Sequence, residues 1–357
     1  MDCVIDAVVH CQSWQCLHLK QNHDFPSPDG FPTKPPIRYN VQTARVNVMP
    51  ATVGYLLLSS NAIFRMGVFQ KLQTVFQSNR KLVIQQRFEL LKEAVSGTMS
   101  NFYMARDRES DRIVGLKVGI REKVEFFESR FKGLNKPPEG QIAQTFDHPR
   151  IVQTYEYGRT SDDVPFIVMQ YVRGFGMHMM LNNHDPNLAG NELELVRQMA
   201  EALNVVHKAG YIHRDVCPRN FICAEDGKTL TLIDFGLTLP ATTEFMRPGN
   251  RTGTPLYMAP EVVRRRDTDK RLDIFSFGVT AFHLCTGELP WPGGETSGLA
   301  AMSHDTVEPT DIFSLRPNMN PKLARVITRC MAPNRDNRPV EFDAILRELR
   351  PLKSFDK

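Results

Sequence analysis

The sequence has few of the features that mark disulfide-stabilised or nucleic-acid-binding proteins. Its 357 residues include 2 tryptophans and 7 cysteines. An odd number of cysteines, in a chain long enough to bury a hydrophobic core, argues against a disulfide framework, so we expect a reduced, cytoplasmic protein. The 44 basic and 40 acidic side chains nearly cancel, and a net charge of +4 gives no reason to expect nucleic acid as a partner.

Long apolar runs are also scarce. Residues 46–64 are uncharged, but they include Pro50, Gly54 and Asn61, so their hydrophobicity is too poor to favour a membrane-spanning helix. What remains is a globular composition, 41% hydrophobic and 24% charged. The length is typical of two domains or one large one.

Charge is unevenly distributed along the chain. Residues 1–87 contain nine basic and four acidic side chains, a net +5, which leaves −1 for the remaining 270 residues. We therefore expect residues 1–87 to be a basic, loosely ordered extension. Residues 66–78 within it carry apolar side chains at helical spacing, namely Val68, Leu72, Val75 and Phe76. Such a helix would pack on the rest of the chain or contact an anionic membrane surface through residues 66–87.

The rest of the chain predicts strands first and helices later. Residues 88–118 have the pattern of an antiparallel strand meander, with a polar turn at 107–112. Helical periodicity follows at 193–210, which ends on a glycine, and again at 271–287 and 321–331. This order predicts an α+β protein with one lobe mostly of strands and one mostly of helices.

The strongest chemical signal is a pair of short motifs. The first is His213-Arg214-Asp215-Val216-Cys217-Pro218-Arg219-Asn220, and Asp234-Phe235-Gly236 begins 14 residues after Asn220. Together they supply two carboxylates and an amide. Phosphoryl transfer needs a carboxylate to orient the attacking hydroxyl, and oxygen ligands to hold Mg²⁺ against a triphosphate. The two motifs resemble those of the eukaryotic-type protein kinase family, and bacterial members in particular.

The resemblance covers about residues 88–350. It implies a bilobal kinase domain at 88–351, with a small, mostly antiparallel β lobe and one main helix at 88–169. A hinge at 170–174 and a larger, mostly α lobe at 175–351 would follow. The family resemblance also implies ATP and Mg²⁺ as cofactors, with Mn²⁺ as a substitute, and protein substrates as partners.

Other family motifs occur in the family's order. Lys117, in Val-Gly-Leu-Lys, resembles the strand lysine that contacts the α- and β-phosphates. The resemblance makes Glu139 its ion-pair partner, with Glu125 and Glu128 as upstream alternatives. Structural positions of the family are matched by Asp273, beneath the catalytic loop, and by the pair Glu261 and Arg338.

The nucleotide pocket implied by the resemblance departs from the family in two places. The glycine-rich loop keeps only Gly97, because Val95 and Ser100 replace its neighbours, which hinders close approach of the backbone to phosphates. Phe102 replaces a valine above the adenine and Gly115 replaces an alanine beside it, so added and lost bulk would offset each other. The implied nucleotide-contacting residues are Val95, Gly97, Ser100, Phe102, Gly115, Lys117, Glu139, Met169 before the hinge, and Gln170 and Val172 in it.

The catalytic loop departs as well. Cys217 stands where Ser/Thr kinases have a lysine that neutralises the moving phosphoryl group. Arg219 would supply that charge, as an arginine does in tyrosine kinases.

The segment 253–261, GTPLYMAPE, is nevertheless typical of Ser/Thr kinases, and we give it more weight because it forms the substrate platform. The implied catalytic residues are Asp215, as base or orienting group, with Lys117, Arg219 and Thr254; the implied metal ligands are Asn220 and Asp234.

Regulation by phosphorylation is compatible with the sequence. Arg214 precedes Asp215, so a phosphate on the activation segment could pair with it. The candidate acceptors for autophosphorylation are Thr242, Thr243 and Thr252.

Two other functions remain as alternatives. One is a pseudokinase that keeps the fold as a nucleotide- or partner-binding module, because its loop is too altered for turnover. The other is a small-molecule phosphotransferase, which the intact Ala-Pro-Glu sequence at 259–261 disfavours. Retention of Lys117, Asp215, Asn220 and Asp234 favours an active kinase.

Overall fold

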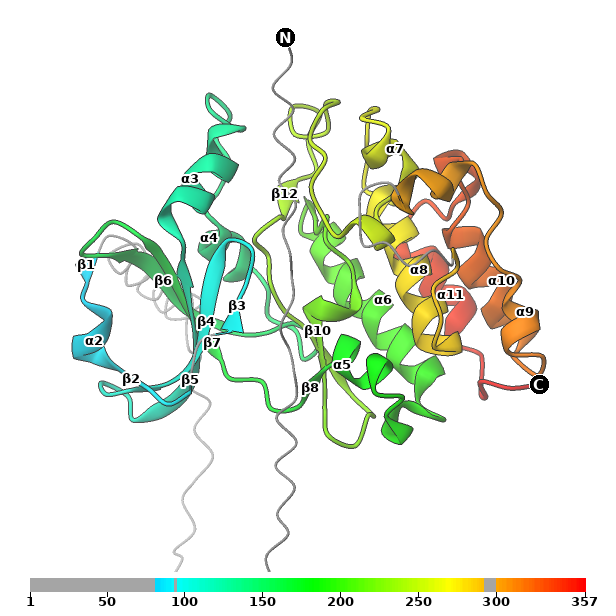
Figure 1. Cartoon of the computed structure of the whole chain (residues 1–357), viewed down its shortest axis with the longest axis horizontal. Helices are drawn as coiled ribbons and strands as arrows, with labels where there is room; N and C mark the ends of the chain where they lie inside the picture. The colour runs from blue at the N-terminus through cyan, green and yellow to red at the C-terminus, as the bar shows by residue number, and fades with distance from the viewer. Residues whose placement is uncertain (1–80, 93–94, 292–299) are drawn as a thin grey trace, which may run out of the picture. The chain divides into compact units, whose positions relative to one another are not determined.

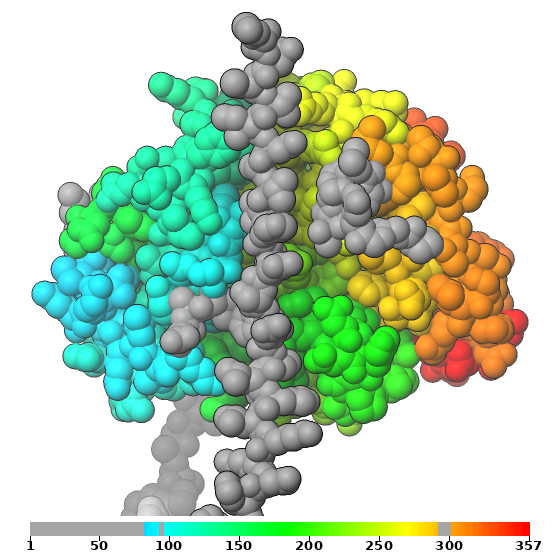
Figure 2. Space-filling model, in the orientation of Figure 1, coloured from blue at the N-terminus to red at the C-terminus, as the bar shows by residue number. Residues whose placement is uncertain are grey.

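The computed structural model describes residues 81–92, 95–291 and 300–357, which form two lobes (Figure 1). The smaller lobe is built on a β-sheet and the larger one on helices, so the predicted α+β, bilobal class is confirmed. In the space-filling view, residues coloured cyan to teal gather on one side and those coloured yellow to red on the other (Figure 2). The uncharged stretch 46–64 and the helix expected at 66–78 lie outside the described residues.

The smaller lobe contains a sheet in the order β1-β6-β7-β5-β4-β2, with β3 paired to β4. Its strands are β1 Lys81–Leu82, β2 Phe88–Leu90, β3 Val95–Ser96, β4 Ser100–Asp107, β5 Arg112–Gly119, β6 Thr154–Thr160 and β7 Pro165–Gln170. Among the described strand pairs of this sheet, β1 and β6 run parallel and the others antiparallel. The meander predicted over 88–118 is therefore confirmed, with its turn between β4 and β5.

The described sheet begins upstream of Phe88, the expected start of the domain. β1 and α2 (Ile84–Arg87) place Leu82 in the same apolar cluster as Phe88. Arg87 donates to both carboxylate oxygens of Asp107, at 3.0 and 3.1 Å, and to Glu156 at 2.8 Å. At the end of the segment considered for membrane contact, Lys81 and Leu82 thus lie in the sheet and residues 84–87 form α2 beside it.

Two short helices stand where one main helix is expected in this lobe. α3 spans Arg121–Ser129 and α4 spans Glu139–Ala143. Pro137 and Pro138 lie between them, and proline disfavours helical backbone in the residue before it. A proline fits well at the start of a helix, so α4 begins directly after Pro138.

The larger lobe is mostly helical. Its α-helices are α5 Met177–Asn182, α6 Glu192–Lys208, α7 Pro260–Val263, α8 Arg271–Thr286, α9 Ile312–Leu315, α10 Pro321–Cys330 and α11 Phe342–Leu349. The helices predicted at 193–210, 271–287 and 321–331 correspond to α6, α8 and α10 and are confirmed. Gly210 follows α6 and Gly287 follows α8, with φ of +83° and +79°, a conformation that glycine adopts without strain.

Small sheets and turns hold the loops between these helices. β8 Phe175–Gly176, β10 Phe221–Cys223 and β11 Leu230–Leu232 form one sheet, and β9 Tyr211–Ile212 pairs with β12 Leu239–Pro240. The 3₁₀ turns are η1 Pro186–Leu188, η2 Pro218–Asn220, η3 Pro255–Tyr257, η4 Ala300–Asp305 and η5 Arg335–Asn337. Since η2 leads directly into β10 and Asp234 closely follows β11, the two chemical motifs lie at the ends of adjacent strands.

The core of the larger lobe is centred on α8. Phe275, Phe277 and Phe282 of this helix are almost completely buried, and so is the carboxylate-bearing Asp273 near its start. Burial of such large aromatic side chains is the main source of stability in a lobe of this kind. Among the helices that the structure describes, none combines the length and the apolar character needed to cross a bilayer.

Candidate active site

The catalytic loop is held from below by one buried carboxylate. Asp273 accepts hydrogen bonds from the backbone N–H groups of His213, at 2.7 Å, and Arg214, at 2.8 Å. Its carboxylate also lies 2.8 Å from Nε2 of His207 on α6. Burial acts to raise the pKa of Asp273, but the bonds from His207 and the backbone hold it below its usual range. This support fixes the loop where Arg214 adopts a φ of +69°, uncommon for a residue with a side chain.

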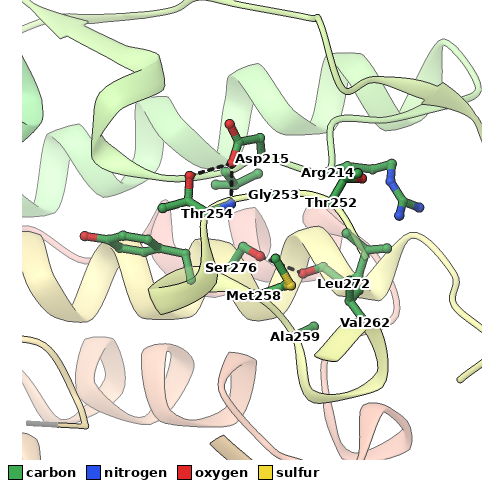
Figure 3. A pocket seen from close by; sticks show the side chains of 12 residues that line it. Arg214, Asp215, Thr252, Gly253, Thr254, Met258, Ala259, Val262, Leu272 and Ser276 are labelled. Atoms are coloured by element: carbon green, nitrogen blue, oxygen red, sulfur yellow. Dashed lines mark hydrogen bonds between the residues drawn. The ribbon is translucent and has the colours of Figure 1, made fainter. Parts of the chain in front are cut away.

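Asp215 joins the catalytic loop to the activation segment. Its Oδ1 accepts hydrogen bonds from the backbone N–H of Thr254, at 2.9 Å, and from the Thr254 hydroxyl, at 2.8 Å. Its Oδ2 accepts from Nδ2 of Asn220 at 3.0 Å. Figure 3 shows both bonds from Thr254, and shows the Arg214 guanidinium pointing away from the Asp215 carboxylate. The structure thus brings two of the predicted site residues, Thr254 and Asn220, within hydrogen-bond distance of a third, Asp215.

A second group of charges is centred on Lys117. Its Nζ lies 2.6 Å from Oε1 of Glu139 on α4 and 2.7 Å from Oδ1 of Asp234. Burial acts to lower the pKa of Lys117, but the carboxylates of Asp234 and Glu139 raise it above its usual range. Partial desolvation acts to raise the pKa of Asp234, but the lysine holds it below its usual range. Lys117 therefore pairs with Glu139, and not with either upstream glutamate on α3.

Asp234 and Asn220 are linked through the backbone. The N–H of Ile233 donates to the carbonyl of Asn220 at 2.8 Å, and Oδ1 of Asp234 accepts from the N–H of Gly236 at 2.8 Å. The Asp234 side chain is 44% exposed. No set of three or more His, Cys, Asp or Glu within the described residues is arranged to hold a metal ion. One carboxylate and one amide oxygen suit Mg²⁺, which completes its shell with phosphate oxygens and water.

The loop between β3 and β4 turns back towards Asp234. The N–H of Gly97 donates to the carbonyl of Ser100 at 2.7 Å, and a Cβ at position 97 would lie 3.1 Å from that oxygen. Met99, at the tip, packs over Gly236, where an added Cβ would lie 3.2 Å from the Met99 methyl group. The loop therefore closes with one glycine, and its apolar tip contacts the turn that carries Asp234.

Phe102 and Gly115 form one structural unit on β4 and β5. A Cβ on Gly115 would meet ring atoms of Phe102 at 2.8 and 2.9 Å and Cγ of Met169 at 3.1 Å. The pairing register places Gly115 opposite Met169, and the backbone of Val95 opposite Phe102. The ring of Phe102 thus occupies the space that a side chain at position 115 would need. The larger residue at 102 and the smaller one at 115 therefore compensate for each other, as expected from the sequence.

The hinge offers backbone groups to a ligand. The N–H of Gln170, at the end of β7, donates to the carbonyl of Gln153 at 2.8 Å. Val172 follows outside the strand, and across the described ranges neither of its backbone groups has a hydrogen-bond partner. Backbone polar groups in partly buried positions are normally paired, so the edge of an adenine ring would supply hydrogen-bond partners to the N–H and carbonyl of Val172.

Cys217 and Arg219 lie in contrasting environments on the same loop. Cys217 is buried, and its sulfur lies 3.5 Å from the hydroxyl oxygen of Thr254. Burial raises the pKa of the Cys217 thiol to about 12, so it is neutral at physiological pH. Arg219, within η2, is exposed, and in the part of the chain that the structure describes its guanidinium forms no ion pair.

Two buried arginines frame the activation segment. Arg338 donates to both oxygens of Glu261, at 2.7 and 2.9 Å. Arg214 donates one bond, from Nη2 to the carbonyl of Asn250 at 2.9 Å, and its Nε and Nη1 have no partner among the described residues. Burial lowers the pKa of Arg214 to about 10. The hydroxyl of Thr252 donates to the side chain of Asn250 at 3.3 Å, so it lies close to this arginine.

The residues that position Glu139 were missed by sequence reasoning. A Cβ on Gly140 would lie 2.2 Å from Cβ of Tyr157, so only glycine lets α4 approach β6 this closely. The ring of Phe131 packs against that of Phe245 in the activation segment. A glycine directly after the glutamate was a usable signal, but the contact partners are distant in sequence and no local pattern marks them.

Comparison with known proteins identifies the class of protein to which this site belongs. The model of the family described as protein kinase domain matches residues 88–348. The chain therefore belongs to the protein kinase family, as the resemblance of its motifs predicts.

The chain is similar to bacterial proteins named as serine/threonine-protein kinases. It is 32% identical over 269 residues to pkn3 of Myxococcus xanthus, covering 72% of this chain and 48% of that protein. It is 29% identical over 261 residues to PknB of Mycolicibacterium smegmatis, covering 71% and 41%. Identity to PrkC of Bacillus subtilis is 29% over 253 residues, covering 70% and 38%. The chain thus matches less than half the length of each of these relatives.

Proposed function

We propose that this chain is a protein kinase that transfers the γ-phosphate of ATP to serine and threonine hydroxyls of protein substrates. The observation that carries the proposal is the arrangement at Asp215, whose carboxylate is fixed by Thr254 and Asn220. Phosphoryl transfer depends mainly on positioning and on charge stabilisation. A fixed carboxylate on one loop, with Lys117 paired to Asp234 on the adjoining one, provides both.

The roles follow from the geometry of each group. Asp215 would orient the acceptor hydroxyl and take its proton, since its oxygens already accept from a hydroxyl and an amide. Lys117 would contact the α- and β-phosphates of ATP. Asn220 donates through Nδ2, which leaves its oxygen free to join Asp234 as a ligand of Mg²⁺, with Mn²⁺ as the substitute. Mg²⁺ supplies neutralisation of the triphosphate charge when bound.

Thr254 supports serine and threonine as acceptors. Its backbone N–H and hydroxyl both donate to the same oxygen of Asp215, which fixes the segment after it relative to the catalytic carboxylate. The names of the relatives agree with this choice. Arg219 would supply the cation that Cys217 does not, because the thiol is neutral and buried whereas the guanidinium is exposed.

Phosphorylation of the activation segment would regulate the same site. Arg214 has two donors without a partner in the described part of the chain, and Thr252 lies beside Asn250, the residue that Arg214 contacts. A phosphate on Thr252 would bring an anion to these donors. Thr242 and Thr243 are the other candidate acceptors.

The test is transfer of labelled phosphate from ATP with Mg²⁺ to the protein itself and to myelin basic protein. Acid hydrolysis of the product should release phosphoserine and phosphothreonine. Phosphotyrosine as the main product would contradict the proposed acceptor class. Label on hydroxylated metabolites offered in the same assay, and none on protein, would favour the small-molecule phosphotransferase.

A further inference from the structure

Arg219 is an exposed cation beside the catalytic aspartate. It lies in η2, between Asp215 and Asn220 on one short loop, and is the only exposed residue of that turn. Within the described ranges its guanidinium pairs with no carboxylate. Its charge extends towards α5, where burial and then Arg219 lower the pKa of His178. A substrate chain placed over Asp215 would therefore pass an unneutralised positive charge.

The activation segment and the turn after α7 add more exposed arginines. Arg247, Arg265 and Arg266 are exposed, and none of them forms an ion pair with another described residue. The acidic residues of the same stretch offset them only in part. Glu261 is buried against Arg338. Glu244, which accepts the hydroxyl of Thr242 at 2.6 Å, and Asp267 are the exposed acidic neighbours. We call Arg219, Arg247, Arg265 and Arg266 the basic surface.

We propose that the basic surface selects protein substrates whose acceptor serine or threonine lies within an acidic segment. The inference rests on the proposed function and specifies its substrate class. The bond between Thr254 and Asp215 ties the activation segment to the catalytic loop that carries Arg219. The N–H of Thr268 donates to the carbonyl of Met246 at 3.1 Å, which joins the segment carrying Arg247 to the turn carrying Arg265 and Arg266. Residues flanking an acceptor at Asp215 would therefore extend over these segments. Complementary charge at such a surface raises the association rate and excludes basic partners.

The test compares three peptides that share one threonine and differ only in the flanking residues, which are Glu, Gln or Lys. Glu and Gln have nearly the same shape, so the ratio of their kcat/KM values isolates charge. We expect kcat/KM to be roughly tenfold higher for the Glu peptide than for the Gln peptide at about 20 mM salt, and the ratio to shrink at about 300 mM. Equal values for Glu and Gln, or a preference for Lys, would overturn the inference.

Substitutions of the arginines test whether the basic surface produces the preference for the Glu peptide. Arg219→Gln, and separately the double variant Arg247→Gln with Arg266→Gln, should each lower the Glu/Gln ratio at least about threefold. The ratio is the informative readout because Arg219→Gln is also expected to slow transfer to every peptide. Arg347→Gln, which removes a similarly exposed arginine from α11, should leave the ratio unchanged. A ratio that survives both basic-surface variants would refute this assignment of residues.

The same assay separates this inference from the proposed function. Label on the kinase itself but on none of the peptides would overturn the acidic-substrate inference and leave the kinase activity established. No label on the kinase or on any peptide would overturn the proposed function, and the inference with it.

Discussion

The ring of Phe131, between α3 and α4, lies 5.9 Å from the ring of Phe245 in the activation segment, with the two planes tilted by 46°. Phe131 also packs edge-on against Phe127 of α3, with centroids 5.3 Å apart. Only 6% of Phe131 and 9% of Phe245 are exposed. Since Pro137 and Pro138 connect this cluster to Glu139, the contact links the activation segment to the carboxylate that pairs with Lys117.

Loss of either ring should therefore reduce turnover. Phe131→Ala and Phe245→Ala should each lower kcat about tenfold, and the double variant should be little worse than either single one, because both remove the same contact. Phe126→Ala provides the matched control, since Phe126 lies on α3 and is 67% exposed. Thermal melting of each variant shows whether a fall in kcat comes from the lost ring contact or from unfolding of the protein. Additive effects, or unchanged kcat in folded variants, would disprove the link.

Position 115 should tolerate a side chain only when Phe102 is replaced by a smaller residue. Gly115→Ala places a Cβ 2.8 Å from the ring of Phe102, which forces the ring or the strand to move. We expect the KM for ATP to rise roughly tenfold in Gly115→Ala and to recover in the double variant with Phe102→Val. Steady-state kinetics with varied ATP measures both. A double variant as impaired as Gly115→Ala would show that the ring is not the obstacle.

Gly140 should be required for the position of α4. In Gly140→Ala the new Cβ would lie 2.2 Å from Cβ of Tyr157, an atom that no rotamer change can move. The helix must then shift away from β6 and weaken the Lys117–Glu139 pair, so kcat should fall at least about tenfold. Gln141→Ala, an exposed change on the same helix, is the control. Full activity in Gly140→Ala would contradict this requirement, because the Lys117–Glu139 pair would then form even with α4 displaced from β6.

The described cysteines should not react in the folded protein. Cys217, Cys223, Cys285 and Cys330 are all buried. Burial raises the pKa of Cys217, Cys223 and Cys330 to about 12, and raises that of Cys285 further, so the thiolate form is negligible at pH 8. Iodoacetamide treatment followed by peptide mapping should find these four unlabelled until denaturant is added. Rapid native labelling of Cys217 would instead mark it as oxidation-sensitive.

Asp273 should contribute a pH-dependent stability. Its pKa is lowered in the folded protein, so its ionised form stabilises the fold at pH values above the unfolded pKa of about 4, and that contribution is lost as pH falls through the folded value. At pH 7, Asp273→Asn should lower the free energy of unfolding by roughly 3 kcal/mol, because His207 and two backbone N–H groups lose a charged acceptor. Denaturant unfolding at pH 7 and pH 3 should show that the difference in unfolding free energy between wild type and Asp273→Asn is smaller at pH 3. An equal difference at both pH values would contradict a stabilising role for the ionised Asp273.

The parts of the site that residue spacing alone predicted lie close together along the chain, whereas the pairing of Lys117 with Glu139 was expected only from the family resemblance. Asp215 and Asn220 belong to one short loop, so their spacing determines their approach almost without reference to the rest of the fold. Strand alternation and helix periodicity likewise predicted the meander and the helices α6, α8 and α10, because each pattern reflects which side of one element is buried.

What the sequence did not predict depends on pairs of distant residues. The packing of Gly140 on Tyr157, of Phe131 on Phe245, and the placement of Arg87 between Asp107 and Glu156 each join separate elements. No local periodicity encodes such pairs, since a side chain's partner is decided by how the elements pack. The division into α3 and α4 was within reach, because Pro137 and Pro138 disfavour a continuous helix there.

The central claim, phosphate transfer at Asp215, is tested most directly by measuring nucleotide binding and transfer in the same samples of wild type and Asp215→Asn. The substitution keeps the size of the side chain, so ATP binding should be retained in both proteins. Wild type should transfer labelled phosphate to protein, and Asp215→Asn should lose at least about a hundredfold of that rate. Wild type that binds ATP with Mg²⁺ and transfers nothing, or Asp215→Asn that transfers as fast as wild type, would contradict the account; the first result would make the chain a pseudokinase.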